Sequence, residues 1–322
     1  MAYGNVGATP RFYIDYIQYW MMKGMLVNAG LPNSNIIDGS LFGLNPSDTT
    51  AWTGSNSTED LNFNISEAVP INTDTMWAGV LGHNLATNGR GYSISDIDSE
   101  GSNVGASAEV EIINKPGAEE IGHDGYSIVT RTPAVTEVAG ASFAMYGGAG
   151  TDINRIGSFC YGQYFEPQAP DMDVSISHRY DGVRKRKSKG GHTLTNVNYY
   201  QPPKWDELEA WQLSGFNSVL SGRRLWELNF SHTPDEDLEP RNYTGQDASG
   251  NFTQNNWLQN LMVFTMGGSL PFIFQPDTSE TWDANTYSVP EFAICRFNMR
   301  TFKRTQILKD VYNIQVTIEE SW

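Results

Sequence analysis

Five basic residues gather in one short stretch of this sequence. They are Arg184, Lys185, Arg186, Lys187 and Lys189, within RKRKSKGG. Complementary charge fixes the register between two protein surfaces, so cations grouped in an otherwise acidic chain suit a contact with an acidic neighbour or a second copy of the chain. We expect this stretch, called the basic run below, to be such an assembly contact. The alternative is a solvated hairpin tip, because strand-like segments flank the run at 174–182 and 192–200.

The residue types that usually carry out catalysis form no recognisable motif. No H-E-x-x-H and no P-loop occur, and GYSIV at 125–129 departs from the G-x-S-x-G elbow at its last position. The histidines are scattered along the chain: His83, His123, His178, His192 and His232. Paired carboxylates for glycoside cleavage stay open as an alternative, because such residues meet in space from distant positions. We expect neither an enzyme nor a cofactor.

Carboxylates crowd the stretch from Asp96 to Glu120, where Lys115 is the nearby cation. Oxygen ligands of this kind hold calcium, but an ordered D-x-D-x-D-G loop is missing from the stretch. We therefore expect a solvated acidic surface here and no bound metal.

The charge balance limits the classes of partner. The formal net charge is −16 at pH 7 and the isoelectric point is near 4.6, which disfavours nucleic acid and anionic membranes as partners. The most apolar stretch, FYIDYIQYWMMKGMLV, is interrupted before it reaches the roughly 20 residues that a membrane span needs. With no signal peptide visible, we expect a soluble protein made in a cytoplasm. Cys160 and Cys295 lie in apolar segments and are expected to be buried, reduced thiols.

Alternating apolar and polar residues predict a β-sheet in the last hundred residues. RRLWELNF places Trp226, Leu228 and Phe230 on one face, and VYNIQVTIE alternates in the same way. Between them, NNWLQNLMVFTMGG has helical spacing and stops at two glycines, which predicts one helix that covers the sheet. Two further strands are expected at 271–274 and 291–297.

The N-terminal stretch 11–26 changes its apolar period from two to 3.6, which predicts a short strand that runs into a helix. Its Met21, Met22 and Met25 are expected to form a core face, with a docking surface as the alternative. Short strands broken by glycine, asparagine and aspartate turns then predict a β-sandwich up to about residue 165.

The chain as a whole is predicted to be mainly β, with four segments. Residues 1–40 would be a strand-helix segment that belongs to the C-terminal domain, and 41–165 a β-sandwich. Residues 166–221 would hold a linker and a basic hairpin. Residues 222–322 would form a β-sheet domain with one packed helix.

A turn after one of the sandwich strands carries a first resemblance. VLGHNLATNG at 80–89 follows the alternating LNFNI strand, and a buried strand that ends in Gly-His-Asn-Leu resembles the galactose-binding-like (discoidin) jelly-roll modules. The resemblance implies a jelly-roll sandwich over 41–165, of a kind that often binds glycans through loops at one end. Aromatic rings stack on sugars, so Trp52, Trp77 and Tyr126 are the candidate glycan contacts, with burial in the core as the alternative for each.

The order of elements near the C-terminus carries a second resemblance. The strand at 226–230, a polar loop, a helix ending at Met266, then GGSLPFIFQPD, PEFAICRF and a closing IEESW resemble tail structural proteins of tailed bacteriophages. The distal tail or tail-tip ring component is the most similar, since its β-rich belt domain with one helix forms rings at the end of the tail tube. The resemblance implies a ring of this chain, with six copies to match the tube.

These resemblances predict a structural component of a virion tail that is assembled in the host cytoplasm. Its partners would be copies of itself, the tail tube, other tail-tip proteins and a glycan of the host surface, with no nucleic acid and no membrane insertion. The alternative function is a carbohydrate-binding module protein without an assembly role.

Overall fold

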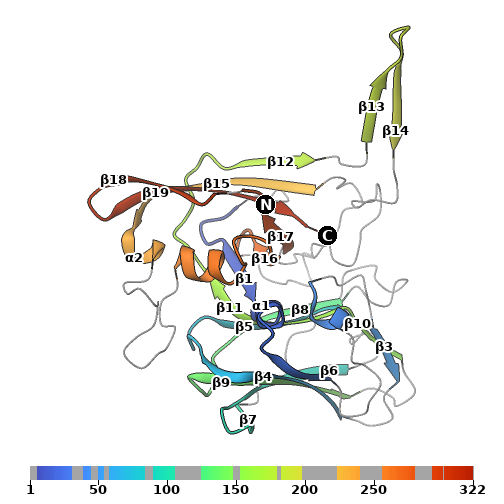
Figure 1. Ribbon diagram of the computed structural model, residues 1–322, viewed down its shortest axis with the longest axis vertical. Coiled ribbons are helices and arrows are strands. Elements are labelled where there is room, and N and C mark those ends of the chain that lie inside the picture. Colours follow the sequence, from blue (N-terminus) through green and yellow to red (C-terminus); the bar gives the residue numbers. More distant parts are fainter. Residues whose placement is uncertain are drawn as a thin grey trace.

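The computed structural model describes residues 6–30, 39–44, 50–53, 58–83, 90–105, 125–147, 153–179, 183–197, 223–239, 256–279, 292–299 and 301–321. Within these ranges the chain is mainly β and is built from large antiparallel sheets, which confirms the predicted fold class. Two sheets pack against each other in one half of the molecule, and one of them continues through the other half (Figure 1).

A ten-stranded antiparallel sheet joins distant parts of the chain. Its order is β12 (Ser175–Arg179), β15 (Arg223–Pro234), β19 (Val311–Glu320), β17 (Ala293–Phe297), β16 (Phe272–Gln275), β1 (Arg11–Asp15), β11 (Ser158–Phe165), β5 (Met76–His83) and β8 (Gly125–Arg131). The tenth strand, β18 (Lys303–Leu308), lies off this path and pairs with β19. The sheet therefore contains strands from the start, the middle and the end of the sequence.

Strands β15 and β19 confirm the alternation expected from the sequence. The buried pairs along their ladder are Trp226–Ile318, Leu228–Val316 and Phe230–Ile314. Intervening residues such as Glu227 and Gln315 are exposed. One face of this part of the sheet packs into the core and the other meets solvent, as antiparallel sheets commonly do.

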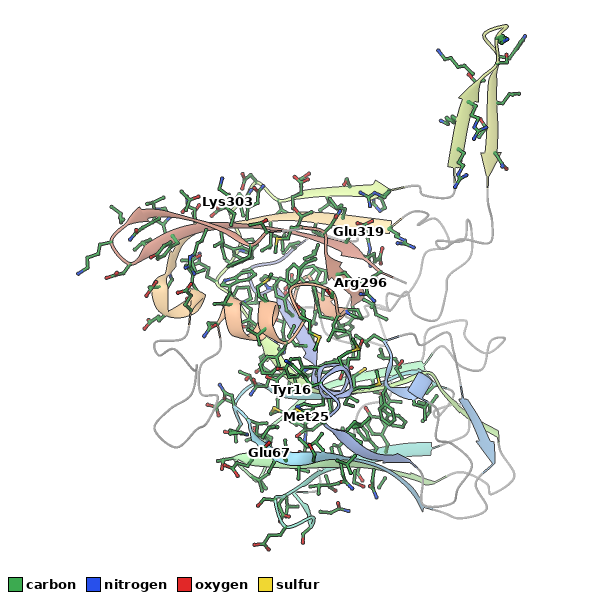
Figure 2. All side chains as sticks on the ribbon, in the orientation of Figure 1. Tyr16, Met25, Glu67, Arg296, Lys303 and Glu319 are labelled. Atoms are coloured by element: carbon green, nitrogen blue, oxygen red, sulfur yellow. The ribbon has the colours of Figure 1, made fainter. Side chains whose placement is uncertain are left out.

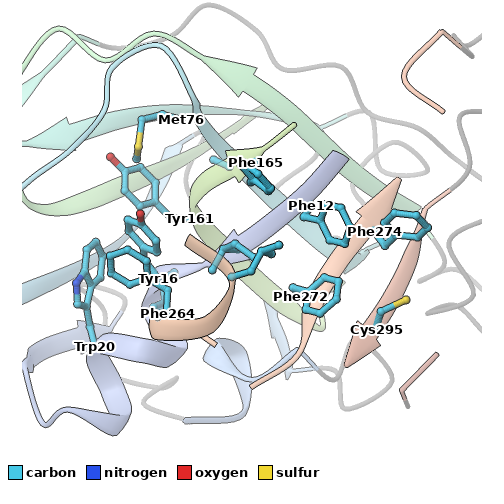
Figure 3. Packing of buried hydrophobic residues seen from close by; sticks show 14 of the residues in the cluster. Phe12, Tyr16, Trp20, Met76, Tyr161, Phe165, Phe264, Phe272, Phe274 and Cys295 are labelled. Carbon is cyan, nitrogen blue, oxygen red and sulfur yellow. The ribbon is translucent and has the colours of Figure 1, made fainter. Parts of the chain in front are cut away.

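Strand β1 connects the two halves of the ten-stranded sheet. It pairs with β16 on one side and with β11 on the other, so that Phe12 lies opposite both Phe274 and Phe165. The Phe12 ring centroid is 5.1 Å from that of Phe274 and 5.7 Å from that of Trp257. Figure 3 shows the Phe12 and Phe274 rings next to each other. Aromatic pairs at these separations add to the stability that burial of the rings provides.

A helix follows β1 directly, as the change in period predicted. Helix α1 (Tyr16–Met22) begins at Asp15, whose carboxylate accepts the backbone N–H of Ile17 at 3.1 Å. Met21 and Met22 lie on its solvent side, with 37% and 61% of their surface exposed. The expectation that these two methionines form a core face was therefore wrong, because Tyr16, Ile17 and Trp20 fill the buried side of the helix.

The second sheet has five strands and completes the predicted β-sandwich. Its order is β2 (Leu26–Gly30), β4 (Thr58–Pro70), β9 (Glu137–Gly147), β6 (Arg90–Ile97) and β7 (Asn103–Val104). It packs on the β11–β5–β8 part of the large sheet (Figure 1). Rings meet between the layers, with Phe143 at 4.7 Å from Phe159 and Phe63 at 5.8 Å from Tyr161. Strands β3 (Thr50–Thr53) and β10 (Ile153–Ile156) form a separate pair, and η1 (Gly39–Phe42) is a short 3-10 helix.

The predicted C-terminal helix is present but shorter and of a different type. Residues Trp257–Val263 form a π-helix, η3, and turns continue to Gly267 and Gly268, whose φ angles of 70° and 86° end the segment. Trp257 packs its ring 4.8 Å from Phe230 and 5.1 Å from Phe165. The segment thus covers the large sheet as expected.

Four cations of the basic run lie in a strand and Lys189 lies in the turn, so the alternative of a hairpin tip holds for Lys189 alone. Strand β12 pairs with β15, and the run itself forms β13 (Val183–Lys187), paired with β14 (Thr193–Val197). The turn spans Ser188 to His192: the backbone N–H of Ser188 donates to the carbonyl oxygen of His192, and the backbone N–H of His192 donates to the Ser188 hydroxyl. Gly191 has φ 85° and gives this turn the left-handed residue it needs. The hairpin stands apart from the rest of the molecule (Figure 1).

The predicted segment boundaries do not separate independent layers. β1, from the 1–40 segment, pairs with strands of both the 41–165 and the 222–322 segments, and β2 belongs to the five-stranded sheet. One cluster of buried apolar residues also runs through all three segments. Local patterns cannot reveal these pairings, because the partners lie far apart in sequence.

Candidate assembly interface

The hairpin places its cations on two opposite faces. Side chains alternate along a strand, so Arg184 and Arg186 share a face with their cross-strand partners Asn196 and Leu194. We call these four residues the arginine face. An open hollow of about 270 Å³ is lined by these four residues and by Thr195, which lies between Leu194 and Asn196 in the sequence.

The opposite side of the hairpin carries lysines. Lys185 and Lys187 lie across from Thr195 and Thr193, and we call these four residues the lysine face. The side chains of both faces are exposed and extend away from the hairpin (Figure 2). Leu194, an apolar side chain with 61% of its surface exposed, sets the arginine face apart.

The cations of the hairpin have no ion-pair partner among the residues that the structure describes. All five predicted contact residues lie here, four in β13 and Lys189 in the turn, and 183–197 contains no carboxylate. Since the chain carries −16 and the hairpin +5, the rest of the chain carries −21. The structure therefore brings the basic run together as one projecting, positively charged element on an acidic molecule.

A second charged element lies at the far end of β15. Helix α2 (Asp235–Leu238) follows the strand directly and opens with Asp235, Glu236 and Asp237. Burial of the Asp237 carboxyl, and then the negative charge of Glu236, raise its pKa above the usual 3.8. Nearby, Arg304 of β18 forms an ion pair with Glu239. Sequence reasoning missed this acidic element, although DED at the start of a short helix was its visible sign.

The candidate glycan contacts do not form a described aromatic surface. Trp77 is fully buried, donates from Nε1 to the carbonyl oxygen of Ile14 at 3.1 Å, and packs edge-on against Tyr13. It cannot stack on a sugar, because the core covers both sides of its ring. The side chains of Trp52 in β3 and Tyr126 in β8 lie outside the described part of the structure.

Asp96 is not part of a solvated acidic surface, which corrects a second expectation. Its carboxylate is buried between the layers and binds Arg131 through two bonds, of 2.5 Å and 2.9 Å. The hydroxyl of Tyr161 donates to the same carboxylate at 2.7 Å. Asp98 does lie at the surface, where it accepts the backbone N–H groups of Glu100 and Ser102. Most of the stretch from Asp96 to Glu120 lies outside the described residues.

A buried serine–histidine contact has no access for a substrate. His83 Nε2 is 3.3 Å from Ser127 Oγ, and neither side chain has exposed surface. The pair joins β5 to β8 within the core.

Within the described ranges, no group of three or more His, Cys, Asp and Glu residues could hold a metal ion. No helix among the described residues is long and apolar enough to cross a membrane. Cys160 and Cys295 are buried, as expected, and form no disulfide bond with each other.

Comparisons with known proteins give little guidance. No family model matches the sequence, and no curated protein matches it either. A solved structure of truncated AlyQ, with CBM32 and alginate lyase domains, aligns with 92% of this chain and 99% of its own at 10% sequence identity. Its TM-score is 0.27, and a likeness at that level carries no conclusion about this chain.

Proposed function

We propose that this protein is a structural component of a bacteriophage tail, placed at the distal tail or tail tip, and that it assembles with copies of itself. Its partners would include the tail tube and other tail-tip proteins, and it would reside in the virion after assembly in the host cytoplasm. The order of C-terminal elements resembles that family, and the described sheet with its covering helix is compatible with a belt-like domain.

One observation carries the assembly part of this proposal. A hairpin with five cations and no carboxylate projects from a chain whose remaining residues carry −21. Among the described residues this arm stands apart from the rest of its chain, so a neighbour could stabilise it, and its charge favours an acidic neighbour. The strands at the margins of the large sheet, β12 and β8, offer further backbone groups to a neighbouring subunit.

The glycan-binding alternative has less support. Of its three aromatic candidates, the one whose side chain is described, Trp77, is buried. A blank glycan array would remove this alternative and leave the assembly role untouched.

Negative-stain electron microscopy of the purified full chain tests the proposal. We expect ring-shaped particles with cyclic symmetry, because a repeated head-to-tail contact closes into a ring when its rotation permits. Isolated particles of the size of one 35.8 kDa chain at every concentration would contradict the self-assembly that we propose.

A further inference from the structure

We propose that the arginine face of the hairpin docks on the acidic α2 end of β15 in a second copy of this chain. This inference rests on the proposed assembly role and gives it a defined contact. It assigns binding to Arg184, Arg186 and Leu194, and it leaves the lysine face in solvent.

The first step of the argument is the difference between the two faces. A guanidinium presents a planar fork that binds a carboxylate through two parallel bonds, whereas an ammonium is a strongly hydrated point charge. Arg184 and Arg186 stand two residues apart on one face and border the same hollow. Exposed Leu194 lies beside them and offers apolar surface, which is usual at the centre of an interface.

The second step identifies the partner by its charge. The rest of any second copy carries −21 outside its own hairpin, so this local contact is attractive although two whole chains, at −16 each, repel at long range. Among the described residues, Asp235, Glu236 and Asp237 place three carboxylates in succession. A guanidinium brought to this place would meet the opposite charges of Asp235, Glu236 and Asp237.

The third step is the placement of the two elements. β12 ends at Arg179, opposite Arg223 at the start of β15, and the hairpin begins four residues later at Val183. α2 begins at the other end of β15, whose 12 residues span about 40 Å at about 3.3 Å each. The hairpin is directed away from the sheet (Figure 1). When two different surfaces lie at opposite ends of one subunit, they give a head-to-tail contact, which is the type of contact that forms rings.

Two charge-matched variants of the full chain test the face assignment. Arg184→Ser/Arg186→Ser and Lys185→Ser/Lys187→Ser each remove two positive charges from the same strand and leave the core unchanged. In sedimentation velocity at low salt, we expect the arginine variant to weaken self-association by roughly tenfold or more and the lysine variant by roughly threefold or less. Circular dichroism checks that both variants keep the fold. Equal losses in the two variants would overturn the face assignment.

A charge swap tests the partner surface. Arg184→Glu/Arg186→Glu alone and Asp235→Lys/Glu236→Lys alone should each lose self-association, and an equimolar mixture of the two should regain it because each contact again joins opposite charges. A mixture that stays dissociated, or an Asp235→Lys/Glu236→Lys variant that associates like wild type, would overturn the docking on α2. If the wild type associates and the arginine variant associates equally well, this inference is refuted and the proposed function is not. If the wild type never associates, the proposed function is refuted as well.

Discussion

Replacing Arg131 by methionine should destabilise the protein strongly, because it would leave the Asp96 carboxylate buried without its counter-ion. Asp96 lies on β6 of the five-stranded sheet, whereas Arg131 and Tyr161 belong to β8 and β11 of the large sheet. The three side chains therefore connect the two layers of the sandwich. The Asp96 and Arg131 side chains are 0% and 5% exposed, so water cannot replace the lost bonds.

The size of the effect follows from this burial. Breaking a buried ion pair by removing one partner costs about 3–5 kcal/mol. Because the Tyr161 hydroxyl still donates to Asp96 at 2.7 Å, we expect Arg131→Met to lie near the lower limit, at about 3 kcal/mol. Tyr161→Phe removes one hydrogen bond to a charged group and should cost about 2 kcal/mol. Arg131→Met/Asp96→Asn should cost less than the sum of its single changes, since no buried charge is then left alone.

Urea unfolding, followed by tryptophan fluorescence, measures these free energies. The matched control is Arg179→Met, because the Arg179–Glu319 pair has the same 2.5 Å N–O distance but an Arg179 side chain that is 49% exposed. Solvent screens such a pair, and we expect its loss to cost less than about 1 kcal/mol. If Arg131→Met and Arg179→Met destabilise the protein equally, the argument from burial is refuted.

Two further predictions concern β1 and its surroundings. A Cβ at Gly162 would collide with the backbone carbonyl oxygen of Ile14 across the β1–β11 ladder, so Gly162→Ala should lower the free energy of unfolding by about 3 kcal/mol. Gly190→Ala, in the open hairpin turn, should change that free energy by less than about 0.5 kcal/mol. Similar urea midpoints for the two variants would contradict this prediction. Burial raises the pKa of the Asp15 carboxyl from 3.8 to about 7, so the folded state holds this proton more tightly than the unfolded state. The protonated Asp15 carboxyl therefore contributes most to stability below about pH 4, and this contribution is lost as the pH rises to about 7. In that window the free energy of unfolding falls by at most about 1.4 kcal/mol per pH unit. Asp15→Asn should flatten the pH dependence of the urea midpoint in that window, and parallel profiles for variant and wild type would count against the assignment.

Local patterns predicted those strands whose two faces differ. The alternation at Trp226, Leu228 and Phe230 identified β15, and the change in period after Arg11 identified β1 and α1. β18 was not predicted, because all six of its side chains are exposed and no alternation marks it. Its pairing with β19 is what holds it in place.

Pairings between distant residues were beyond the reach of the sequence. Phe12 lies opposite Phe165 and Phe274, and no local spacing indicates that β1 stands between those strands. Asp96 was expected at the surface because acidic neighbours follow it in the sequence. It is buried instead, because the ion pair with Arg131, 35 residues away, offsets the desolvation cost of its carboxylate.

The basic run was identified as a charged element from its composition, but its geometry came only with the structure. A run of cations between two strand-like segments is typical of a tip, whereas here Ser188 to His192 make the turn and the run forms a strand. This difference matters, because only a strand separates its arginines from its lysines onto two faces.

The most direct test of the assembly account is the mass of the purified full chain by native mass spectrometry over a range of protein concentrations. The account predicts a discrete closed oligomer, six copies of the 35.8 kDa chain, which dissociates as the salt concentration rises because the hairpin contact is electrostatic. A mass of 35.8 kDa alone at every concentration and at low salt would contradict it.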